Sequence, residues 1–296
     1  FQLPLARRLG LGFSLTPYSS VGYRVSADEQ SDDVWGNIGR VQYLYAGEGD
    51  LTEVKLGIGW EVVKRVSIGV AAQYYWGDIE RTYQTVVSNN IVNGGSVNTV
   101  TGTDSYGISR IKMQLGLQAD LIQSERQVLT LGATYDMGGN LRPSVNQTVV
   151  NGDIYGTVVR GDTTRMALKL PVQLGVGLYY QNAKIAAGVD YIYQNWENNE
   201  SPKSVPGAVN VAYKNTNTVK LGFEYTPNRM DIRNYLKRWS YRVGFRYGTY
   251  YQTFEGKTLS QYAVTAGFGM PVRFLGRSSI DFGVEFGQRG NDSPLR

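Results

Sequence analysis

The sequence has neither cysteine nor histidine among its 296 residues. The absence of cysteine excludes disulfide bonds, thiolate metal ligands and cysteine nucleophiles. The absence of histidine removes the usual general base of a serine triad and the commonest ligand for zinc or iron. We therefore expect a protein that is not an enzyme and that holds neither a metal ion nor a cofactor.

Long apolar runs are missing as well. The mean hydropathy is -0.30, and no stretch reaches the ~20 consecutive apolar residues that a transmembrane helix requires. The formal net charge of +5 comes from Lys and Arg residues that are scattered singly along the chain. Nucleic-acid-binding proteins cluster such residues on one face, so we expect no nucleic-acid partner.

Glycine and tyrosine are abundant, with 36 and 22 residues, and apolar residues recur at every second position. Alternation of this kind is the signature of a β-strand whose two faces meet different surroundings. It is clearest between Met166 and Tyr180, where the even-numbered residues are apolar and the odd-numbered ones are mostly polar or small. No segment keeps a helical spacing, so the sequence predicts an all-β fold.

The alternation predicts about eleven strands, and many exceed about 15 residues, against a usual ~5–6 in globular proteins. Long strands with one unbroken apolar face are typical of an antiparallel transmembrane β-barrel, whose apolar face contacts lipid while the polar face lines the lumen. The alternative is a soluble β-protein with an aromatic core, which would have to cover the apolar stripe of every strand. The expected strands are residues 8–26, 37–61, 65–84, 105–121, 127–142, 162–180, 183–198, 209–226, 238–254, 258–274 and 279–289.

The connections between these strands alternate in length. Short ones fall near residues 63, 124, 181 and 276, and long polar ones span 85–104, 143–161 and 197–210. Bacterial outer-membrane barrels have short periplasmic turns and long extracellular loops, so the pattern predicts an integral protein of the bacterial outer membrane. Residues 227–237 form one longer, basic connection on the periplasmic side. The expected aromatic girdles at the two membrane interfaces contain Trp60, Trp76, Tyr180, Tyr191, Tyr225 and Trp239.

Residues 38–61 read as one strand with a change of phase. The apolar positions are odd-numbered before residue 47 and even-numbered after residue 53. A one-residue slip turns every following side chain to the other face, so an outward apolar face needs a bulge or kink here, for which glycine is suited. The functional interpretation is a lateral opening in the barrel wall, and the alternative is an ordinary turn between two shorter strands. The kink is expected at Gly47, Glu48, Gly49 and Asp50.

Three stretches carry a resemblance to a known family: residues 11–23, residues 47–59, and the paired segments 66–69 and 74–77. The second begins Gly-Glu-Gly-Asp-Leu-Thr, where the family tends to have Gly-x-Gly-Gly-Leu-Asn. The third combines Val-Ser-Ile-Gly with a later Tyr-Tyr-Trp-Gly. In these stretches the chain resembles the FadL family of outer-membrane transporters for hydrophobic compounds, in the form common in Bacteroidetes.

The resemblance implies a barrel of about 14 strands in the full chain, within the usual range for such barrels. It also implies an N-terminal hatch in the lumen and lateral release at a kinked strand. The hatch, with the family's Asn-Pro-Ala segment, and the last strand, which normally ends in an aromatic residue, are not found. We therefore expect residues 1–296 to form a single barrel domain that lacks both ends of a longer chain.

Polar residues on the expected lumenal face include cations that could bind a carboxylate head group. The alternative is that these cations form ion pairs across neighbouring strands of the wall, as a narrow barrel requires. The candidates for ligand binding are Arg110, Lys112, Arg165, Lys169, Arg242 and Arg246.

Two functions remain open at this point. One is passive uptake of hydrophobic compounds such as long-chain fatty acids, with lateral release at the kinked strand. The other is a non-transporting barrel subunit of a larger outer-membrane secretion or assembly complex. The expected partners are membrane lipids, lipopolysaccharide, a hydrophobic small molecule and other outer-membrane proteins.

Overall fold

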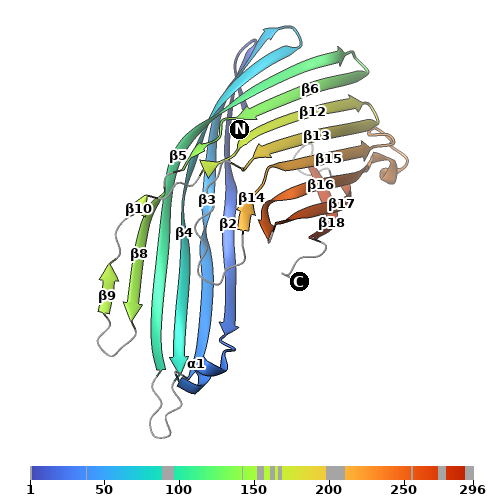
Figure 1. Cartoon of the computed structure of the whole chain (residues 1–296). Helices are drawn as coiled ribbons and strands as arrows, with labels where there is room; N and C mark the ends of the chain where they lie inside the picture. Colours follow the sequence, from blue (N-terminus) through green and yellow to red (C-terminus); the bar gives the residue numbers. More distant parts are fainter. Residues whose placement is uncertain are drawn as a thin grey trace.

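The computed structural model describes residues 2–37, 39–88, 97–141, 143–151, 157–160, 164–165, 169–197, 211–254, 256–272 and 278–290. Most of these residues belong to one antiparallel sheet that curves strongly about its own axis (Figure 1). Successive hydrogen-bonded strands of this wall are β1 (Gln2–Ala6), β2 (Leu9–Asp28), β3 (Arg40–Val63), β4 (Val66–Ser88), β5 (Val97–Gln123), β6 (Gln127–Asp136), β12 (Val172–Asn182), β13 (Ile185–Asn195), β15 (Thr216–Tyr225), β16 (Ser240–Phe254), β17 (Lys257–Val272) and β18 (Ser278–Arg289).

Shorter elements sit beside this path. The helix α1 (Asp32–Asn37) joins β2 to β3, and the 3-10 helix η1 (Tyr235–Arg238) lies between β15 and β16. No helix in the described part of the chain is long and apolar enough to cross a membrane. The remaining short strands are β7 (Gly139–Asn140), β8 (Ser144–Asn151), β9 (Thr157–Arg160), β10 (Thr164–Arg165), β11 (Lys169–Leu170) and β14 (Val211–Tyr213).

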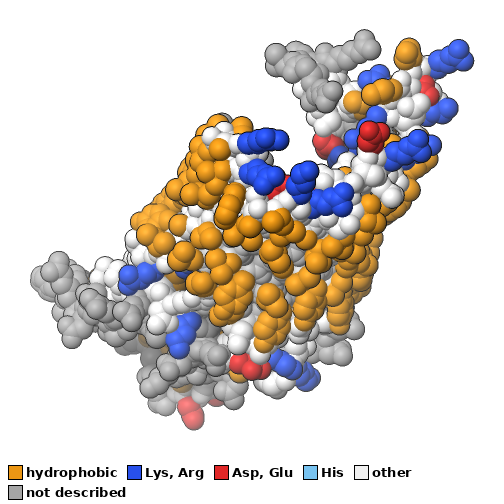
Figure 2. Space-filling model, turned by 90° about the horizontal axis from the view of Figure 1, so that it is seen from above, with side chains coloured by type: hydrophobic (Ala, Val, Ile, Leu, Met, Phe, Trp, Pro, Cys, Tyr) orange, Lys and Arg blue, Asp and Glu red, His pale blue; other side chains and the backbone are white. Residues whose placement is uncertain are grey.

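The two-residue alternation gives the wall its two faces. On β5, Ile111 is 71% exposed, whereas the intervening Lys112 is partly buried. An outward apolar face of this kind would be costly in water and is suited to lipid. Figure 2 shows the apolar side chains in a broad band on the outside of the curved wall, with charged side chains along its rim. The exposed side chains of this band include Leu56, Ile58, Ile68, Val70, Met113, Leu115, Leu117, Leu174, Val176, Leu221, Phe223, Val243, Phe245, Val264, Phe282 and Val284.

The strands differ greatly in length. At ~3.3 Å per residue, the 24 residues of β3 span about 80 Å and the 11 residues of β13 about 36 Å. A membrane-spanning strand needs only ~9–11 residues. Strands β2 to β5 therefore continue well past the others, as Figure 1 shows. We call this part the extension, and the opposite end, with the turns near residues 64, 125 and 183, the turn end.

Each of the eleven expected strands corresponds to one strand of the path, and β1 adds a further one. The boundaries differ where the chain leaves the wall. The strand expected at 127–142 ends at Asp136 because the following residues fold to the inner face, and that expected at 162–180 enters the wall only at Val172. The long connection expected at 85–104 is partly strand, since β4 and β5 form one hairpin that reaches Ser88 and Val97. Residues 89–96 and 198–210, and parts of 143–168, lie outside the described residues.

Candidate functional site

The expected kink lies inside a continuous strand, so the segment is not a turn. Strand β3 runs from Arg40 to Val63 and keeps one register against β4 from Arg40 to Glu61. That ladder has a gap: the pairs Gly49↔Ile79 and Thr52↔Trp76 are formed, while Asp50 and Leu51 on β3 and Gly77 and Asp78 on β4 are left out of it. We call these four residues the β3–β4 break.

Two glycines make the break geometrically feasible. Gly49 has φ +125° and Gly77 has φ +152°, conformations that residues with a Cβ rarely adopt. A Cβ on Gly49 would overlap the carbonyl oxygen of Asp78, and one on Gly77 would overlap the carbonyl oxygen of Asp50. The two backbones therefore approach as closely as they do only because both positions are glycine.

The bulge itself lies on the neighbouring strand. The pairs between β2 and β3 shift by one residue between Pro17↔Thr52 and Ser19↔Leu51, which leaves Tyr18 as the extra residue. The slip that the sequence pattern suggested for β3 is thus found on β2, directly beside the break. The alternation of β3 alone could not assign it, because either partner of a pair can carry the bulge.

Behind the break, the chain after β6 folds onto the inner face of the wall. We call residues 137–141 and Pro143 the inward segment. Its Leu141 is 1% exposed and packs against Leu51 of the break and Ile108 of β5, with Ile79 and Leu170 at the edge of the cluster. Because Leu51 belongs to the break, Leu141 closes the break from the lumenal side.

Local contacts hold the inward segment in place. A Cβ on Gly138 would overlap backbone atoms of Leu170 and Val172, so glycine permits the sharp departure from β6. Strand β7 then pairs with β11 through Lys169↔Asn140 and Leu170↔Gly139. Since β11 leads directly into β12, the inward segment is tied to the main wall.

A buried polar cluster lies next to the inward segment. The Tyr75 hydroxyl donates to Glu53 Oε1 at 3.2 Å, and the Gln73 amide donates to Asp136 Oδ1 at 3.2 Å. Gln173 donates to the second oxygen of Asp136 at 3.1 Å. These bonds satisfy two carboxylates that are each only 9% exposed, as burial of charge requires. Glu53 was not among the predicted site residues, although its alternation with Lys55 in the sequence indicates that it lies on this face.

Arg110 and Lys112 are the predicted ligand-binding cations nearest the break. Arg110 Nε donates to the carbonyl oxygen of Leu141 at 3.0 Å. The Lys112 ammonium lies 5.8 Å from the centre of the Tyr75 ring, a cation–π contact. Both cations therefore adjoin the inward segment and the polar cluster.

The predicted cations Lys169 and Arg165 lie in short strands of the same region. Lys169 belongs to β11 and faces Asn140 of the inward segment across the ladder. Arg165 belongs to β10 and pairs with Ser144 of β8, which follows the inward segment. Three of the six predicted cations are thus in strands that contact the inward segment, and Arg165 is in a strand that pairs with β8 directly after it.

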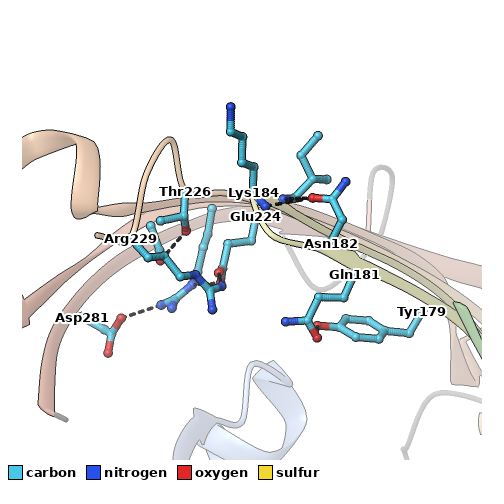
Figure 3. A network of polar contacts seen from close by, with 11 residues as sticks. Tyr179, Gln181, Asn182, Lys184, Glu224, Thr226, Arg229 and Asp281 are labelled. Atoms are coloured by element: carbon cyan, nitrogen blue, oxygen red, sulfur yellow. Dashed lines mark hydrogen bonds and ion pairs between the residues drawn. The ribbon is translucent and has the colours of Figure 1, made fainter. Parts of the chain in front are cut away.

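Arg242 and Arg246, the other two, are neutralised by the wall itself. Arg242 Nε lies 2.8 Å from Glu224 Oε2, and its Nη1 lies 2.5 Å from Asp281 Oδ1. Arg246 Nη2 lies 3.0 Å from Glu285 Oε1. Figure 3 shows Glu224 and Asp281 of this network from close by. At Arg242 and Arg246 the lumenal face therefore carries cross-strand ion pairs rather than a binding site for the carboxylate of a ligand.

Replacing Arg242 with glutamine is expected to lower barrel stability more than Arg246→Gln does. Arg242 joins two carboxylates on strands β15 and β18, whereas Arg246 joins one. All these groups are partly or fully exposed and screened by solvent, so the loss of stability should be small for both variants. The temperature at which the folded band disappears in a heat-shift gel measures the difference. Equal shifts for the two variants would contradict the bridging role of Arg242.

The inner face near the turn end is hollowed. Gly188, Gly222 and Gly244 are direct partners on successive strands β13, β15 and β16. They line an open hollow of about 730 Å³ together with charged residues such as Asp190 and Lys220. Because glycine has no side chain, this part of the lumen keeps room that larger residues would fill.

The predicted girdle residues lie along both edges of the outward apolar band. Trp60, Tyr191 and Tyr225 are exposed. The other three rest on neighbours: Trp76 stacks on Tyr74, Trp239 stacks on Phe268, and the Tyr180 hydroxyl donates to Gln127. Trp76 directly precedes Gly77, so the β3–β4 break lies where the apolar band ends on the side of the extension.

Comparisons with known proteins find one family and several solved structures that are similar to this chain. The model of the BamG family matches residues 1–294. No curated protein matches the chain. The solved CymD monoaromatic hydrocarbon channel is 14% identical and has a TM-score of 0.50, with 95% of this chain and 82% of that chain covered. The toluene transporter TodX of P. putida is 12% identical with a TM-score of 0.43, covering 96% and 88%. The likeness to CymD shows the fold, an antiparallel transmembrane β-barrel.

Proposed function

The chain belongs to the BamG family, and we propose that it is an integral outer-membrane barrel that takes up hydrophobic compounds passively. Long-chain fatty acids are one such class. The compound would leave sideways at the β3–β4 break, whose lumenal side Leu141 covers at rest. The Bacteroidetes form of the FadL family, which the sequence resembles, stays a prediction.

The break is the observation that carries this proposal. Asp50 and Leu51 lie in a gap of the ladder, so widening the wall there costs no existing pair with β4. The side chains behind the gap are apolar, with Leu51, Ile108 and Leu141 in contact. A route that is apolar on its lumenal side and has few hydrogen bonds to open suits a molecule that partitions into lipid. The hydrocarbon channels with the same fold support the choice of cargo class.

A carboxylate head group, if the cargo carries one, would meet Arg110 and Lys112. These two cations lie beside the inward segment, whereas Arg242 and Arg246 already hold carboxylates of the wall. Arg110 would exchange its bond to the Leu141 carbonyl for a bond to the head group. The head group would then loosen the contact that holds Leu141 over the break.

A barrel subunit of a larger outer-membrane complex is the second candidate. The extension favours it, because Val25, Tyr45 and Tyr83 are exposed there and are direct partners on adjacent strands. Contiguous exposed apolar side chains beyond the membrane mark a surface for another protein. In this case the charged residues of the lumen would only pair with one another within the barrel and would bind no ligand.

Native mass spectrometry of the barrel, combined with uptake into vesicles, tests the two functions. For a transporter we expect a small lipid-like mass on a lone barrel extracted in mild detergent. We also expect labelled palmitate to enter proteoliposomes that contain the barrel faster than it enters empty liposomes. A protein partner of fixed stoichiometry, with uptake no faster than in empty liposomes, would reject the transporter and support the subunit.

A further inference from the structure

The connection between β15 and β16, residues 226–239, is long for the turn end and is internally ordered. The Asn228 N–H donates to the Lys237 carbonyl at 2.8 Å and closes the loop at its base. Asp231 Oδ1 accepts from the backbone N–H groups of Asn234 at 2.8 Å and Arg233 at 2.9 Å. These donors, with the Lys237 ammonium, hold the pKa of Asp231 below its usual value. The loop therefore presents its side chains from a fixed frame.

Its tip exposes apolar side chains among cations. Ile232 is 98% exposed and Met230 is 88% exposed, more than any other large apolar residue in the described part of the chain. Four Lys or Arg residues accompany a single acid, Asp231, in this connection. Arg229 turns back to Glu224 of the wall at 3.4 Å. Lys237 Nζ lies 3.9 Å from Asp231 Oδ2, and the Arg238 guanidinium lies 5.5 Å from the centre of the Tyr235 ring. Together with Arg233, these two cations give the connection its excess of positive charge.

The connection is joined to the membrane-facing side of the wall. The Tyr235 hydroxyl donates to the carbonyl oxygen of Pro271 at 2.8 Å. The Tyr235 ring meets Trp239 edge-on at 6.1 Å, and Trp239 stacks on Phe268 at 5.1 Å. Phe268 in turn contacts Phe282 of the outward apolar band. The aromatic girdle thus continues into η1, which places the connection at the membrane interface.

We propose that residues 226–239 form an anchor for anionic phospholipid in the adjoining leaflet. Arg233, Lys237 and Arg238 hold the phosphate groups, and Ile232 and Met230 enter the boundary between head groups and acyl chains. The combination of cations, aromatic residues and projecting aliphatic tips is that of interfacial membrane segments. Continuity with the girdle favours lipid over a protein partner. The anchor rests on the proposed function only for the membrane location and needs no transport.

Lipid retention tests the cations. The barrel is placed in nanodiscs of phosphatidylethanolamine and phosphatidylglycerol at a ratio of about 3:1, which approximates the negative charge of a bacterial inner leaflet. Native mass spectrometry then counts the lipids that the barrel retains. The triple variant R233Q/K237Q/R238Q should retain roughly tenfold less phosphatidylglycerol than the parent. The matched control K64Q/R126Q/K184Q removes the same charge from three other turns of that end and should retain as much as the parent. Equal losses in both triple variants would overturn the anchor.

A single cysteine tests the apolar tip, because the chain has no cysteine of its own. Ile232→Cys labelled with an environment-sensitive dye should be quenched by doxyl lipid and protected from iodide. Ser124→Cys, on another turn of that end, should show the opposite. Iodide access at residue 232 equal to that at residue 124 in a pure-lipid nanodisc would overturn the proposal and point to a protein partner. Neither readout depends on uptake, so failure of the transporter proposal would leave this test intact.

Discussion

Replacing Gly49 with alanine is expected to prevent stable assembly of the wall rather than merely narrow the break. The new Cβ would overlap the backbone oxygen of Asp78, which cannot rotate away. The φ of +125° adds strain of ~1–3 kcal/mol for a residue with a side chain. The loss of the heat-resistant folded band in a gel, and of protein in the outer-membrane fraction, measures the effect.

Gly47→Ala is the matched control two residues away. There the atoms nearest to the added Cβ belong to the ring of Tyr23, and the backbone has no positive φ. A side chain can turn aside where a carbonyl oxygen cannot, so this variant should fold and insert. Equal folding of the two variants would show that the close approach at the break is not required. Gly49→Val would not test whether closing the lateral opening stops uptake, because a misfolded barrel and a closed opening would give the same loss of uptake.

A disulfide between β7 and β11 is expected to abolish uptake reversibly. Asn140 and Lys169 are direct partners in an antiparallel pair, and such Cα atoms lie ~4.5–5.5 Å apart, within the range of a disulfide. The bond would tie the inward segment to β12 and keep Leu141 over the break. The oxidised N140C/K169C variant should transport labelled palmitate at less than about a tenth of the rate of the same variant with its thiols reduced. The reason is that the proposed mechanism has only this one exit route.

Reduction separates the lock from the substitutions themselves. Uptake by N140C/K169C should return on addition of dithiothreitol, which the loss of Lys169 alone would not explain. The control S88C/V97C closes a direct pair at the tip of the β4–β5 hairpin, far from the break, and should transport equally in both states. Unchanged uptake by the oxidised N140C/K169C variant would show that the inward segment does not move during transport.

The fold could be predicted from the sequence because its main signal is local. Alternation in β12, from Leu174 to Leu178, or in β5, from Ile111 to Leu117, gives the two faces without any knowledge of neighbours. Strand ends at the turn end follow in the same way from short polar connections. The predicted strand boundaries are wrong where a strand changes its pairing partner, as after Asp136. Such a change does not alter the alternation of apolar residues, so the sequence pattern does not reveal it.

The site was predicted only in part for the same reason. Gly49, which directly precedes the break, was predicted from the sequence, but the bulge at Tyr18 is a property of a strand pair and has no signature in β2 alone. Leu141 sits in a segment whose alternation continues that of β6, so the sequence placed it in the wall. Glu53 and Asp136 could be assigned to the lumenal face, but their partners Tyr75, Gln73 and Gln173 come from other strands and required the three-dimensional structure.

The gap in the β3–β4 ladder omits the same number of residues on each strand, and the register is therefore identical on both sides. If the wall opens at the break as proposed, the gap would act as a hinge rather than as a sliding joint. The two halves of the β3–β4 hairpin would tilt against each other without losing a β3–β4 pair, and the register would be the same after closure. Repeated opening and closing would then accumulate no error in strand pairing.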